Sequence, residues 1–349
     1  MYADTLIRDP VFQLNLLLWM AKDQPHEQFR VRPLFREYGF SPMVIEQPFQ
    51  FPVEVFIRIE RSTLDISKQP EPELILGGAG NKAMYFECKA HSFGADSSNS
   101  RQARGHLVAA GGAFAEVFRP LENCLLSYVV PDSDREGMRL CLSDLRRQLA
   151  DASFSPGRFS VQGLKVDGAN IVYTWDRELS QHLGIAEPPS REMAVLELGA
   201  QDTYPSPLVL VYTDEDCPNP MSRDFYRRIL SAKLRAALLC DLHQEAEATV
   251  VSISAGRLLA STTAEMFQYL GRERQNGLLA FVRKNILDFI VAEWKPKIPG
   301  LVTVVGQNVT LKWTTDKDRQ DFLEWLEDRE TDFPAERVMQ GELFDAGGN

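Results

Sequence analysis

The stretch MYFECKAHSF, residues 84–93, places a glutamate and a lysine two positions apart inside an apolar run. Because side chains of a strand alternate between its two faces, Glu87 and Lys89 would share one face, and Phe86 and Cys88 the other. One interpretation is an ion pair on a solvent-exposed face of a sheet, which contributes little to stability. The other is an active site in which an acid and a lysine work together at a bound metal ion.

A second acid precedes this run by one short hairpin. A Pro-Glu pair ending at Glu73 opens a strand, and the glycine-rich turn at 77–81 joins it to the strand of Glu87 and Lys89. An acid, a short loop and then acid-x-lysine on the next strand resembles the motif of the PD-(D/E)xK, or restriction-endonuclease-like, nuclease superfamily. The flanking order of helix, three strands, helix and strand resembles its core. The resemblance covers roughly residues 10–131.

The resemblance implies a role for each residue of the motif. Glu73 and Glu87 would bind Mg²⁺ (with Mn²⁺ able to replace it), the carbonyl oxygen of Cys88 would be a further ligand, and Lys89 would be the catalytic lysine. Two carboxylates suit Mg²⁺, which prefers oxygen ligands and keeps several waters, while substrate phosphate fills another position. A lysine there can orient the attacking water and stabilise the charge that develops on the phosphate. Gln102, near the start of the next helix, would point into the site.

One departure from the family pattern concerns the first acid. The family usually has aspartate where this chain has Glu73, whose longer side chain can still reach a metal ion. Asp65 competes for the same role, although it lies outside the clear strand. Glu54 and Glu60, which we predict on the preceding strand, could supply a further carboxylate, but the simpler interpretation of both is a surface charge.

The helix that follows the motif opens with SRQARGH, residues 100–106. Arg101 and Arg104 could meet phosphates of a substrate, or they could lie on a solvated helix face. His91 would share the strand face of the motif, and its simpler interpretation is a polar residue at a strand end. His106 is interpreted as a packing residue.

The hydrophobic pattern predicts an α/β fold with a restriction-endonuclease-like core. The predicted elements of this core are helices within 9–38, a strand within 43–62, two strands within 72–91, a helix within 95–118, a strand at 122–131 and a helix at 132–152.

After about residue 153 the pattern changes to a mixed α+β region. Hairpin-like pieces are followed by long helical patterns at 221–247 and 262–293, a hairpin at 301–313 and an amphipathic helix at 316–330. Basic residues lie among apolar ones in the first of these helices, and a second basic group lies at 271–285; the residues of the first group are Arg223, Arg227, Arg228, Lys233 and Arg235. This region could form a winged-helix-like unit that binds DNA or a partner, or its basic residues could simply offset neighbouring acids.

We therefore predict three parts: a nuclease-like domain at 1–152, an accessory DNA- or partner-binding region at 153–340, and a loose tail at 341–349. The chain of 349 residues is long enough for two domains.

Composition sets limits on the function. The formal net charge of −11 argues against a surface that binds nucleic acid everywhere, although it permits a local basic cleft. The five cysteines are widely spaced without a CxxC pair, so neither a zinc site nor a disulfide framework is predicted. No apolar run approaches the length of a membrane span, and we read no signal peptide, so we expect a cytoplasmic protein without a membrane partner.

These observations lead us to expect a Mg²⁺-dependent endodeoxyribonuclease, a hydrolase acting in restriction or antiviral defence. The alternative is a nuclease-fold subunit with weak or no catalysis that binds DNA or a partner protein, and an RNA-directed nuclease is a third candidate. A partner subunit that supplies a motor or DNA binding would be compatible with the acidic chain. The target sequence and the oligomeric state stay open.

Overall fold

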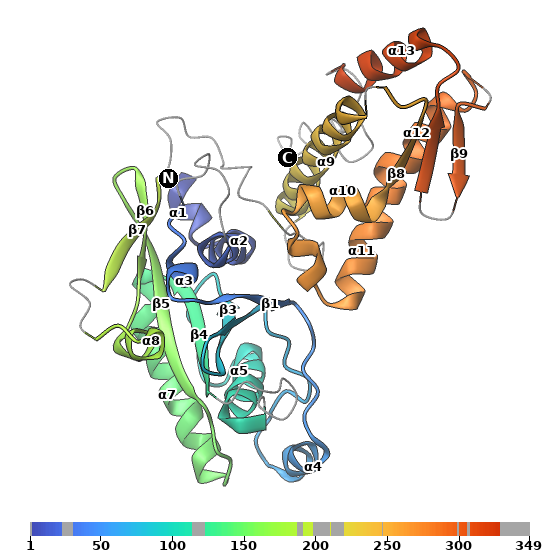
Figure 1. The fold of residues 1–349 in the computed structure, drawn as a ribbon. Helices are drawn as coiled ribbons and strands as arrows, with labels where there is room; N and C mark the ends of the chain where they lie inside the picture. Colours follow the sequence, from blue (N-terminus) through green and yellow to red (C-terminus); the bar gives the residue numbers. More distant parts are fainter. Residues whose placement is uncertain are drawn as a thin grey trace, which may run out of the picture. The chain divides into compact units, whose positions relative to one another are not determined.

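The computed structural model describes residues 2–22, 31–113, 123–186, 191–197, 210, 220–245, 247–298, 300–305 and 308–328. The chain forms two compact units, Met1–Leu208 with Tyr269–Gly271, and Val209–Gln268 with Arg272–Asn349. Each unit combines helices with a β-sheet, so the expected α/β class is confirmed (Figure 1). The first unit continues past residue 152, where we expected a domain to end, because later strands extend its sheet. The predicted loose tail at 341–349 lies outside the described residues.

A seven-stranded mixed sheet forms the centre of the first unit, with the strands in the order β1-β2-β3-β4-β5-β6-β7. The pairs β3–β4 and β4–β5 are parallel, and all other neighbouring strands are antiparallel. The strands are β1 Ser41–Ile45, β2 Leu74–Gly78, β3 Lys82–Cys88, β4 Asn123–Pro131, β5 Arg158–Asp167, β6 Asn170–Thr174 and β7 Glu192–Glu197.

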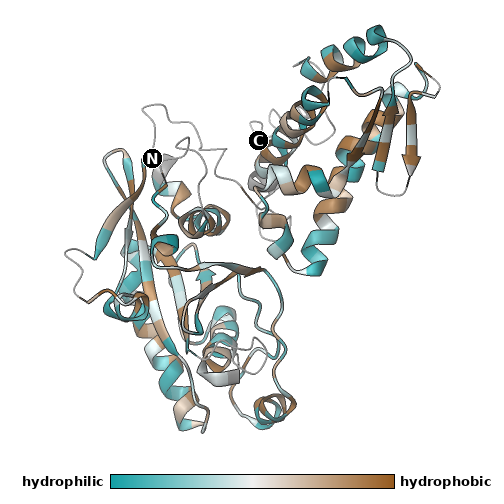
Figure 2. Cartoon of the chain, in the orientation of Figure 1, coloured by the Kyte–Doolittle hydropathy of each residue, from teal (hydrophilic) through white to brown (hydrophobic). Residues whose placement is uncertain are grey.

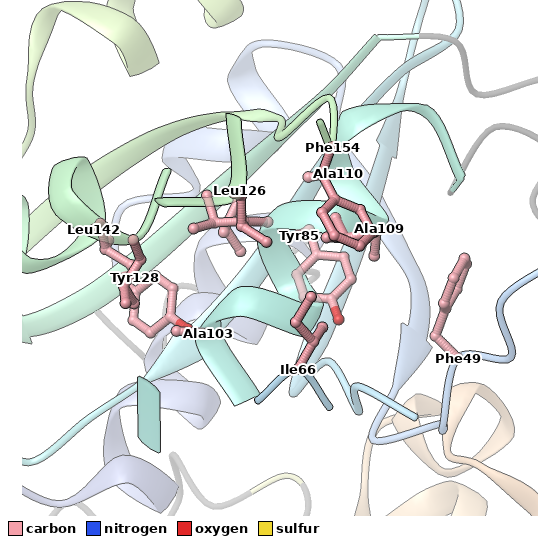
Figure 3. Close-up of a cluster of buried hydrophobic side chains, with 14 of the residues drawn as sticks. Phe49, Ile66, Tyr85, Ala103, Ala109, Ala110, Leu126, Tyr128, Leu142 and Phe154 are labelled. Carbon is pink, nitrogen blue, oxygen red and sulfur yellow. The ribbon is translucent and has the colours of Figure 1, made fainter. Parts of the chain in front are cut away.

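Helices cover both faces of the central strands. On one face, side chains of β3 and β4 form a core with α5 (Ser98–Val108), its continuation Ala109–Ala113, and α7 (Arg135–Asp151). Figure 3 shows this core, which includes Tyr85, Ala103, Leu126, Tyr128 and Leu142. On the other face, α3 (Leu34–Glu37) contributes Phe35, whose ring centroid is 5.3 Å from that of Phe86. Figure 2 shows the corresponding alternation of hydrophobic and hydrophilic residues along α7.

The helix α2, Pro10–Ala21, shows how the sequence fixes an element. Asp9 caps it, since a carboxylate oxygen accepts a hydrogen bond from Val11 N at 3.0 Å, and Pro10 occupies the first turn. Every residue from Val11 to Ala21 is buried, as expected of a helix that is apolar on all sides. The predicted helices within 9–38 are therefore confirmed as α2 and α3, and residues 23–30 between them lie outside the described residues. A short helix, α1 (Tyr2–Leu6), precedes them.

The strand predicted within 43–62 is wrong in its second half. β1 ends at Ile45, and Val53–Arg61 forms the helix α4. The alternation of apolar and charged residues also contains a helical pattern, because Val55, Phe56 and Ile59 fall on one side of a helix and pack against the core. Pro52 stands directly before the helix, where its fixed backbone suits a helix start.

The individual helices and strands predicted between residues 72 and 152 are confirmed. The hairpin of β2 and β3 turns at residues 79–81, where Gly80 and Asn81 have φ of 69° and 57°. Glycine and asparagine tolerate this left-handed backbone, so the sequence determines the position of the turn. The predicted helix within 95–118 is α5, the strand at 122–131 is β4, and the helix at 132–152 is α7. After β6, α8 (Arg177–Leu183) follows, capped by Asp176.

The second unit places four helices and a fifth, C-terminal helix around a three-stranded antiparallel sheet of order β8-β10-β9 within its described residues. The elements in chain order are α9 Pro220–Gln244, β8 Val250–Ser254, α10 Ala255–Thr262, α11 Arg272–Val282, α12 Asp288–Trp294, β9 Val302–Val305, β10 Asn308–Lys312 and α13 Asp316–Glu327. The predicted helix at 221–247 and hairpin at 301–313 are thus confirmed. The helix predicted at 262–293 is wrong in its first part, because α10 ends at Thr262 and α11 begins only at Arg272. The rest is confirmed as α11 and α12, which are joined by a wider helical turn at Arg283–Leu287.

An aromatic cluster forms the core of the second unit beside α13. The ring of Phe322 lies 5.1 Å from Trp294, 5.4 Å from Trp313 and 5.5 Å from Trp325, measured between ring centroids. α13 begins with a capping box, in which Thr315 and Asp318 satisfy each other's backbone N–H groups. None of the described helices combines the length and the apolar character needed to span a membrane.

Candidate active site

The β2–β3 hairpin brings the two predicted acids together. Its register pairs Leu74 with Phe86 and Ile75 with Tyr85, so residue 73 falls opposite residue 87. Directly opposite side chains of an antiparallel pair are neighbours on the same face of the sheet. Lys89 follows the last residue of β3, and its backbone N–H donates a hydrogen bond to Val129 O at 2.9 Å, which continues the pairing with β4.

Lys89 forms ion pairs with both acids. Its Nζ lies 3.0 Å from Glu87 Oε2 and 3.5 Å from Glu73 Oε1. The other oxygen of Glu73 accepts a hydrogen bond from Cys88 N at 2.7 Å. The Glu87 side chain is fully buried, whereas 19% of the Lys89 side chain and 22% of the Glu73 side chain are exposed. Solvent therefore reaches this cluster through Lys89 and Glu73.

The second oxygen of Glu87 faces α5. Glu87 Oε1 lies 3.2 Å from His106 Nε2, and His106 Nδ1 forms a hydrogen bond with the hydroxyl of Tyr85. The two oxygens of Glu87 therefore face an ammonium on one side and a ring nitrogen on the other. A buried carboxylate with so few polar neighbours is costly, and such sites are commonly functional.

Burial and neighbouring charges shift the pKa values of this cluster. Burial raises the pKa of Glu73 to about 7; Lys89 opposes this shift and the charge of Glu87 adds to it. Burial alone would lower the pKa of Lys89, but Glu87 and Glu73 raise it above its ordinary value, so the ammonium stays charged. Burial, with a contribution from Lys89, lowers the pKa of His106 to about 4, although Glu87 acts in the opposite direction.

A neutral His106 has one ring proton to place. Burial raises the pKa of Tyr85 well above its ordinary value, so its hydroxyl also keeps its proton at neutral pH. A proton on Nε2 would face the Glu87 carboxylate and leave Nδ1 to accept from the Tyr85 hydroxyl. This tautomer places a partial positive charge against Glu87, which favours it electrostatically.

Cys88, the last residue of β3, lies between Glu87 and Lys89 and points to the opposite face of the sheet. Its thiol is fully buried, and burial raises its pKa well above the ordinary value. Its backbone N–H is already committed to Glu73. The predicted role of its carbonyl oxygen as a metal ligand stays a prediction.

The polar residues of α5 divide into different roles. Gln102 is half-buried one helical turn before His106, and no described residue forms a hydrogen bond with its side chain. Arg101 is exposed and its Nε lies 3.2 Å from Asp65 Oδ1. Arg104 is buried and donates to Asp65 O, Ala95 O and Gln148 Oε1, so it fixes the chain around α5 rather than offering a free charge.

The competing acids are not brought to the site. The Asp65 side chain is 75% exposed and pairs with Arg101. Glu54 and Glu60 lie on α4, both exposed, and Glu60 pairs with Lys68 at 2.8 Å. The cluster at the end of β3 therefore contains Glu73 and Glu87, two of the five acids considered.

Three side chains that contact the cluster were not predicted from the sequence to do so. His106 and Tyr85 support Glu87, and Gln13 of α2 donates hydrogen bonds to Lys89 O at 3.1 Å and to Ile7 O at 2.7 Å. The signals were present: His106 follows Gln102 by one helical turn, Tyr85 shares the strand face of Glu87, and Gln13 interrupts an apolar helix. His91 is exposed in the loop after Lys89, as expected for a polar residue at a strand end.

Three of the five basic residues named in α9 have local partners, and the side chain of Arg223 lies outside the described residues. Arg227 Nη1 lies 3.6 Å from Asp224 Oδ1, Arg228 Nε donates to Asp224 O, and Arg235 Nη1 donates to Asp328 O. Burial lowers the pKa of Lys233 to about 8. These contacts agree with the simpler interpretation, in which the charges belong to ordinary helical faces.

Comparison with known proteins adds no identification, since no protein-family model, curated protein or solved structure matches this chain.

Proposed function

We propose that the first unit is a metal-dependent nuclease that hydrolyses phosphodiester bonds of DNA. The observation that carries this proposal is the convergence of Glu73, Glu87 and Lys89 at the end of the β2–β3 hairpin. The order of elements supports it, because α2, the antiparallel strands β1 to β3, α5 and the parallel strand β4 resemble the core of the restriction-endonuclease-like superfamily. A setting in restriction or antiviral defence follows from that resemblance alone.

The two acids fit the ligands that Mg²⁺ prefers. Glu73 and Glu87 are neighbouring carboxylates, and the Lys89 ammonium lies beside both of them where a metal ion would add a second positive charge. Among the described residues, no group of three or more His, Cys, Asp and Glu side chains is arranged around one metal position. Two carboxylates are nevertheless sufficient for Mg²⁺, which keeps water ligands and takes others from substrate phosphates.

The charges of the cluster suggest how its residues would act. When bound, Mg²⁺ would polarise the phosphoryl group and lower the pKa of an attacking water. Lys89 stays protonated because both glutamates raise its pKa, so it would stabilise negative charge on the phosphate rather than remove a proton. Glu73, with a pKa of about 7, can lose its proton at neutral pH at little cost when a cation approaches.

A second candidate function is a nuclease-fold subunit that binds DNA or a partner without cutting. The observation that favours it is the position of the Lys89 ammonium, which already neutralises both carboxylates, and the complete burial of Glu87. In this case Lys89 would serve only as the counter-ion of a buried structural cluster.

The second unit could provide nucleic-acid binding for either function. Its order of helix, strand, two helices and a hairpin, with the sheet order β8-β10-β9, resembles a winged-helix fold. In such folds the second helix of the helix-turn-helix lies against DNA. The corresponding helix, α11, and the turn after it expose Arg272, Asn276, Arg283 and Lys284.

The experiment that tests the proposal is cleavage of supercoiled and linear DNA by the full chain with Mg²⁺, Mn²⁺ or EDTA. We expect metal-dependent cutting that falls at least about 100-fold in both Glu87→Gln and Lys89→Ala. The first change weakens a ligand of the metal ion, and the second removes a positive charge beside the phosphate. Glu60→Gln and Lys68→Ala are matched controls, because they alter an exposed Lys–Glu pair of similar length and should leave the rate unchanged.

The other outcomes separate the candidates. Cutting that survives both substitutions at the end of β3 would place the active site elsewhere. If the folded protein cuts nothing with either metal but shifts DNA in a gel equally with and without EDTA, the binding-only function is supported. RNA of the same sequence, included in each series, tests the polymer preference.

A further inference from the structure

A cleft of about 450 Å³ opens on the first unit between α7, the beginning of β5 and α8. A volume of this size is typical of small-molecule sites. Its lining is unusual for an acidic chain, because three of its side chains are arginines that come from two different elements. The lining includes Arg139, Arg146, Arg158, Phe159, Asp176 and Glu178.

The cleft lies far along the sheet from the cluster of Glu87 and Lys89. Arg158 is the first residue of β5 and pairs with Leu125, whereas Cys88, next to Lys89, pairs with Val129. Because β3, β4 and β5 are parallel, Arg158 is at the edge where these strands begin, and Lys89 is at the edge where they end. The two features are therefore separate sites on one sheet.

The arginine side chains of the cleft form few hydrogen bonds and ion pairs with the protein, so their charges are only partly neutralised. Arg158 Nη2 donates to Asn123 Oδ1 at 2.8 Å, and its Nη1 is 3.9 Å from Glu178 Oε2, a long and exposed contact. Arg139 forms two hydrogen bonds with Glu136, at 2.9 and 2.6 Å, on the surface of α7. No carboxylate of the described residues lies within ion-pair distance of Arg146.

One of the two acids of the lining, Asp176, is already bound by donors of the protein. Asp176 accepts hydrogen bonds from Leu179 N at 3.0 Å and Val161 N at 2.9 Å, and from the Ser160 hydroxyl at 2.6 Å. These donors make it the cap of α8 and the anchor of β5, so its charge is stabilised from inside the protein. The arginines consequently give the open side of the cleft an excess of unsatisfied donors.

Phe159 adds an aromatic surface to the same cleft. Its ring is only partly buried against the core of the first unit, so part of it faces the cleft. Arginine forks bind phosphate oxygens, and an exposed aromatic ring stacks with a nucleobase regardless of the base. The combination matches a ligand with a phosphate at one end and a planar base at the other.

We propose that this cleft binds a nucleoside phosphate, with the phosphates on Arg146 and Arg158 and the base against Phe159. The ligand is either a free nucleotide or the 5′-terminal nucleotide of a strand, since both present the same chemistry. The proposal does not depend on the nuclease function, because it uses none of the residues at the end of β3.

The test is calorimetric titration of the full chain in EDTA, which removes any metal-dependent contribution, with ADP, inorganic pyrophosphate and a 5′-phosphorylated single-stranded hexanucleotide as probes. We expect saturable ADP binding that weakens about tenfold in Arg146→Gln and again in Arg158→Gln, the loss expected for one charge-assisted contact each. Phe159→Leu should weaken the binding of ADP but not that of pyrophosphate.

Two controls separate this site from general charge effects. Arg147→Gln changes the next residue of α7, whose side chain is 73% exposed and pairs with Asp144 outside the cleft lining, and should leave ADP binding unchanged. Lys89→Ala should also leave it unchanged. Tighter binding of ADP than of the hexanucleotide supports a free nucleotide, and the reverse supports a strand end.

Three outcomes would overturn the proposal. The first is the absence of saturable ADP binding up to about 1 mM, the weak end of specific affinities. The second is an equal loss in Arg147→Gln and Arg146→Gln, which would mean nonspecific attraction. The third is binding of pyrophosphate as tight as that of ADP, which would remove the base and Phe159 from the site.

Discussion

Two lysine–glutamate pairs of nearly equal length lie in very different surroundings of the first unit. Lys89 Nζ is 3.0 Å from Glu87 Oε2 at the end of β3, and Lys68 Nζ is 2.8 Å from Glu60 Oε1 at α4. The Glu87 side chain is fully buried, whereas 47% of the Glu60 side chain is exposed. By distance alone the two pairs would be equivalent. Breaking the buried pair is costly, because it leaves a charge without water or a partner, whereas the exposed pair contributes little to the free energy of unfolding.

The buried pair also has neighbours that the exposed pair lacks among the described contacts. Glu87 is within 3.2 Å of His106, and Lys89 reaches Glu73 as a second carboxylate. A group of interacting charges in low dielectric shifts pKa values and resists rearrangement. A protein gains little stability from such a cluster, and this low gain is one reason for our proposal that it serves a function.

The largest expected effect comes from removing one partner of the buried pair. Lys89→Met should lower the free energy of unfolding of the metal-free protein by about 3–5 kcal/mol, because Glu87 is left buried without its counter-charge. Urea unfolding at neutral pH in EDTA measures this change. The double variant Lys89→Met with Glu87→Gln should recover much of the loss, and a double variant as unstable as the single one would contradict the assigned coupling.

The next effect concerns pH, where Glu73 and His106 act in opposite directions. The pKa of Glu73 is raised from 4.5 to about 7, so its contribution to stability is present below pH 4.5 and is lost as the pH rises through 7. The pKa of His106 is lowered from 6.5 to about 4, so its contribution is present above pH 6.5 and is lost as the pH falls through 4. Between pH 4.5 and 6.5 the contributions of these two residues to the pH dependence of the free energy of unfolding should nearly cancel.

Glu73→Gln removes the contribution of Glu73 to this pH dependence. As the pH rises from 4.5 to 6.5, the variant should gain about 2 kcal/mol more stability than the wild type, since only the histidine contributions remain. His182, whose pKa burial also lowers to about 4, adds the same slope to both proteins and does not affect the difference. The measurement is metal-free urea unfolding at both pH values, and parallel profiles would show that Glu73 ionises normally.

A smaller effect on the free energy of unfolding is expected from Tyr85, which contacts Glu87 only through His106. Tyr85→Phe removes the hydroxyl that bonds His106 Nδ1 and should cost about 1–2 kcal/mol in the free energy of unfolding, because a buried ring nitrogen loses its partner. Tyr173→Phe is the matched control: its hydroxyl is buried without a hydrogen-bond partner among the described residues, so its removal should be neutral or stabilising. Equal losses in the two variants would assign the effect of Tyr85→Phe to packing instead.

Much of the first unit could be predicted from the sequence because its signals are local. The turn at Gly80 and Asn81 fixes the register of the hairpin, and that register alone places Glu73 opposite Glu87. Spacing along a strand likewise places Lys89 beside Glu87. These are the residues that the motif named.

The contributions of other elements could not be predicted, because they depend on tertiary packing. The spacing of His106 from Gln102 places both on one side of α5, but only the packing of α5 on the sheet brings His106 to Glu87 and buries Arg104 against the loop of Asp65. The sequence of α4 satisfies both the two-residue period of a strand and the helical period, and the packing of Ile59 decides between them. The strand predicted for Glu60 is wrong for this reason.

The smallest expected effect comes from the exposed pair on that helix. Lys68→Met should change the free energy of unfolding by no more than about 0.5–1 kcal/mol, since water replaces the ammonium at Glu60 and salt screens the remaining interaction. Part of any loss would reflect the contact of Lys68 with the ring of Phe56, whose centroid lies 5.3 Å from Nζ. Unfolding at low and high salt separates the two, because screening weakens the ion pair more than it weakens packing of the lysine stem. A loss as large as that of Lys89→Met would mean that burial does not distinguish the two pairs, and the functional interpretation of the β3 cluster would lose its main physical support.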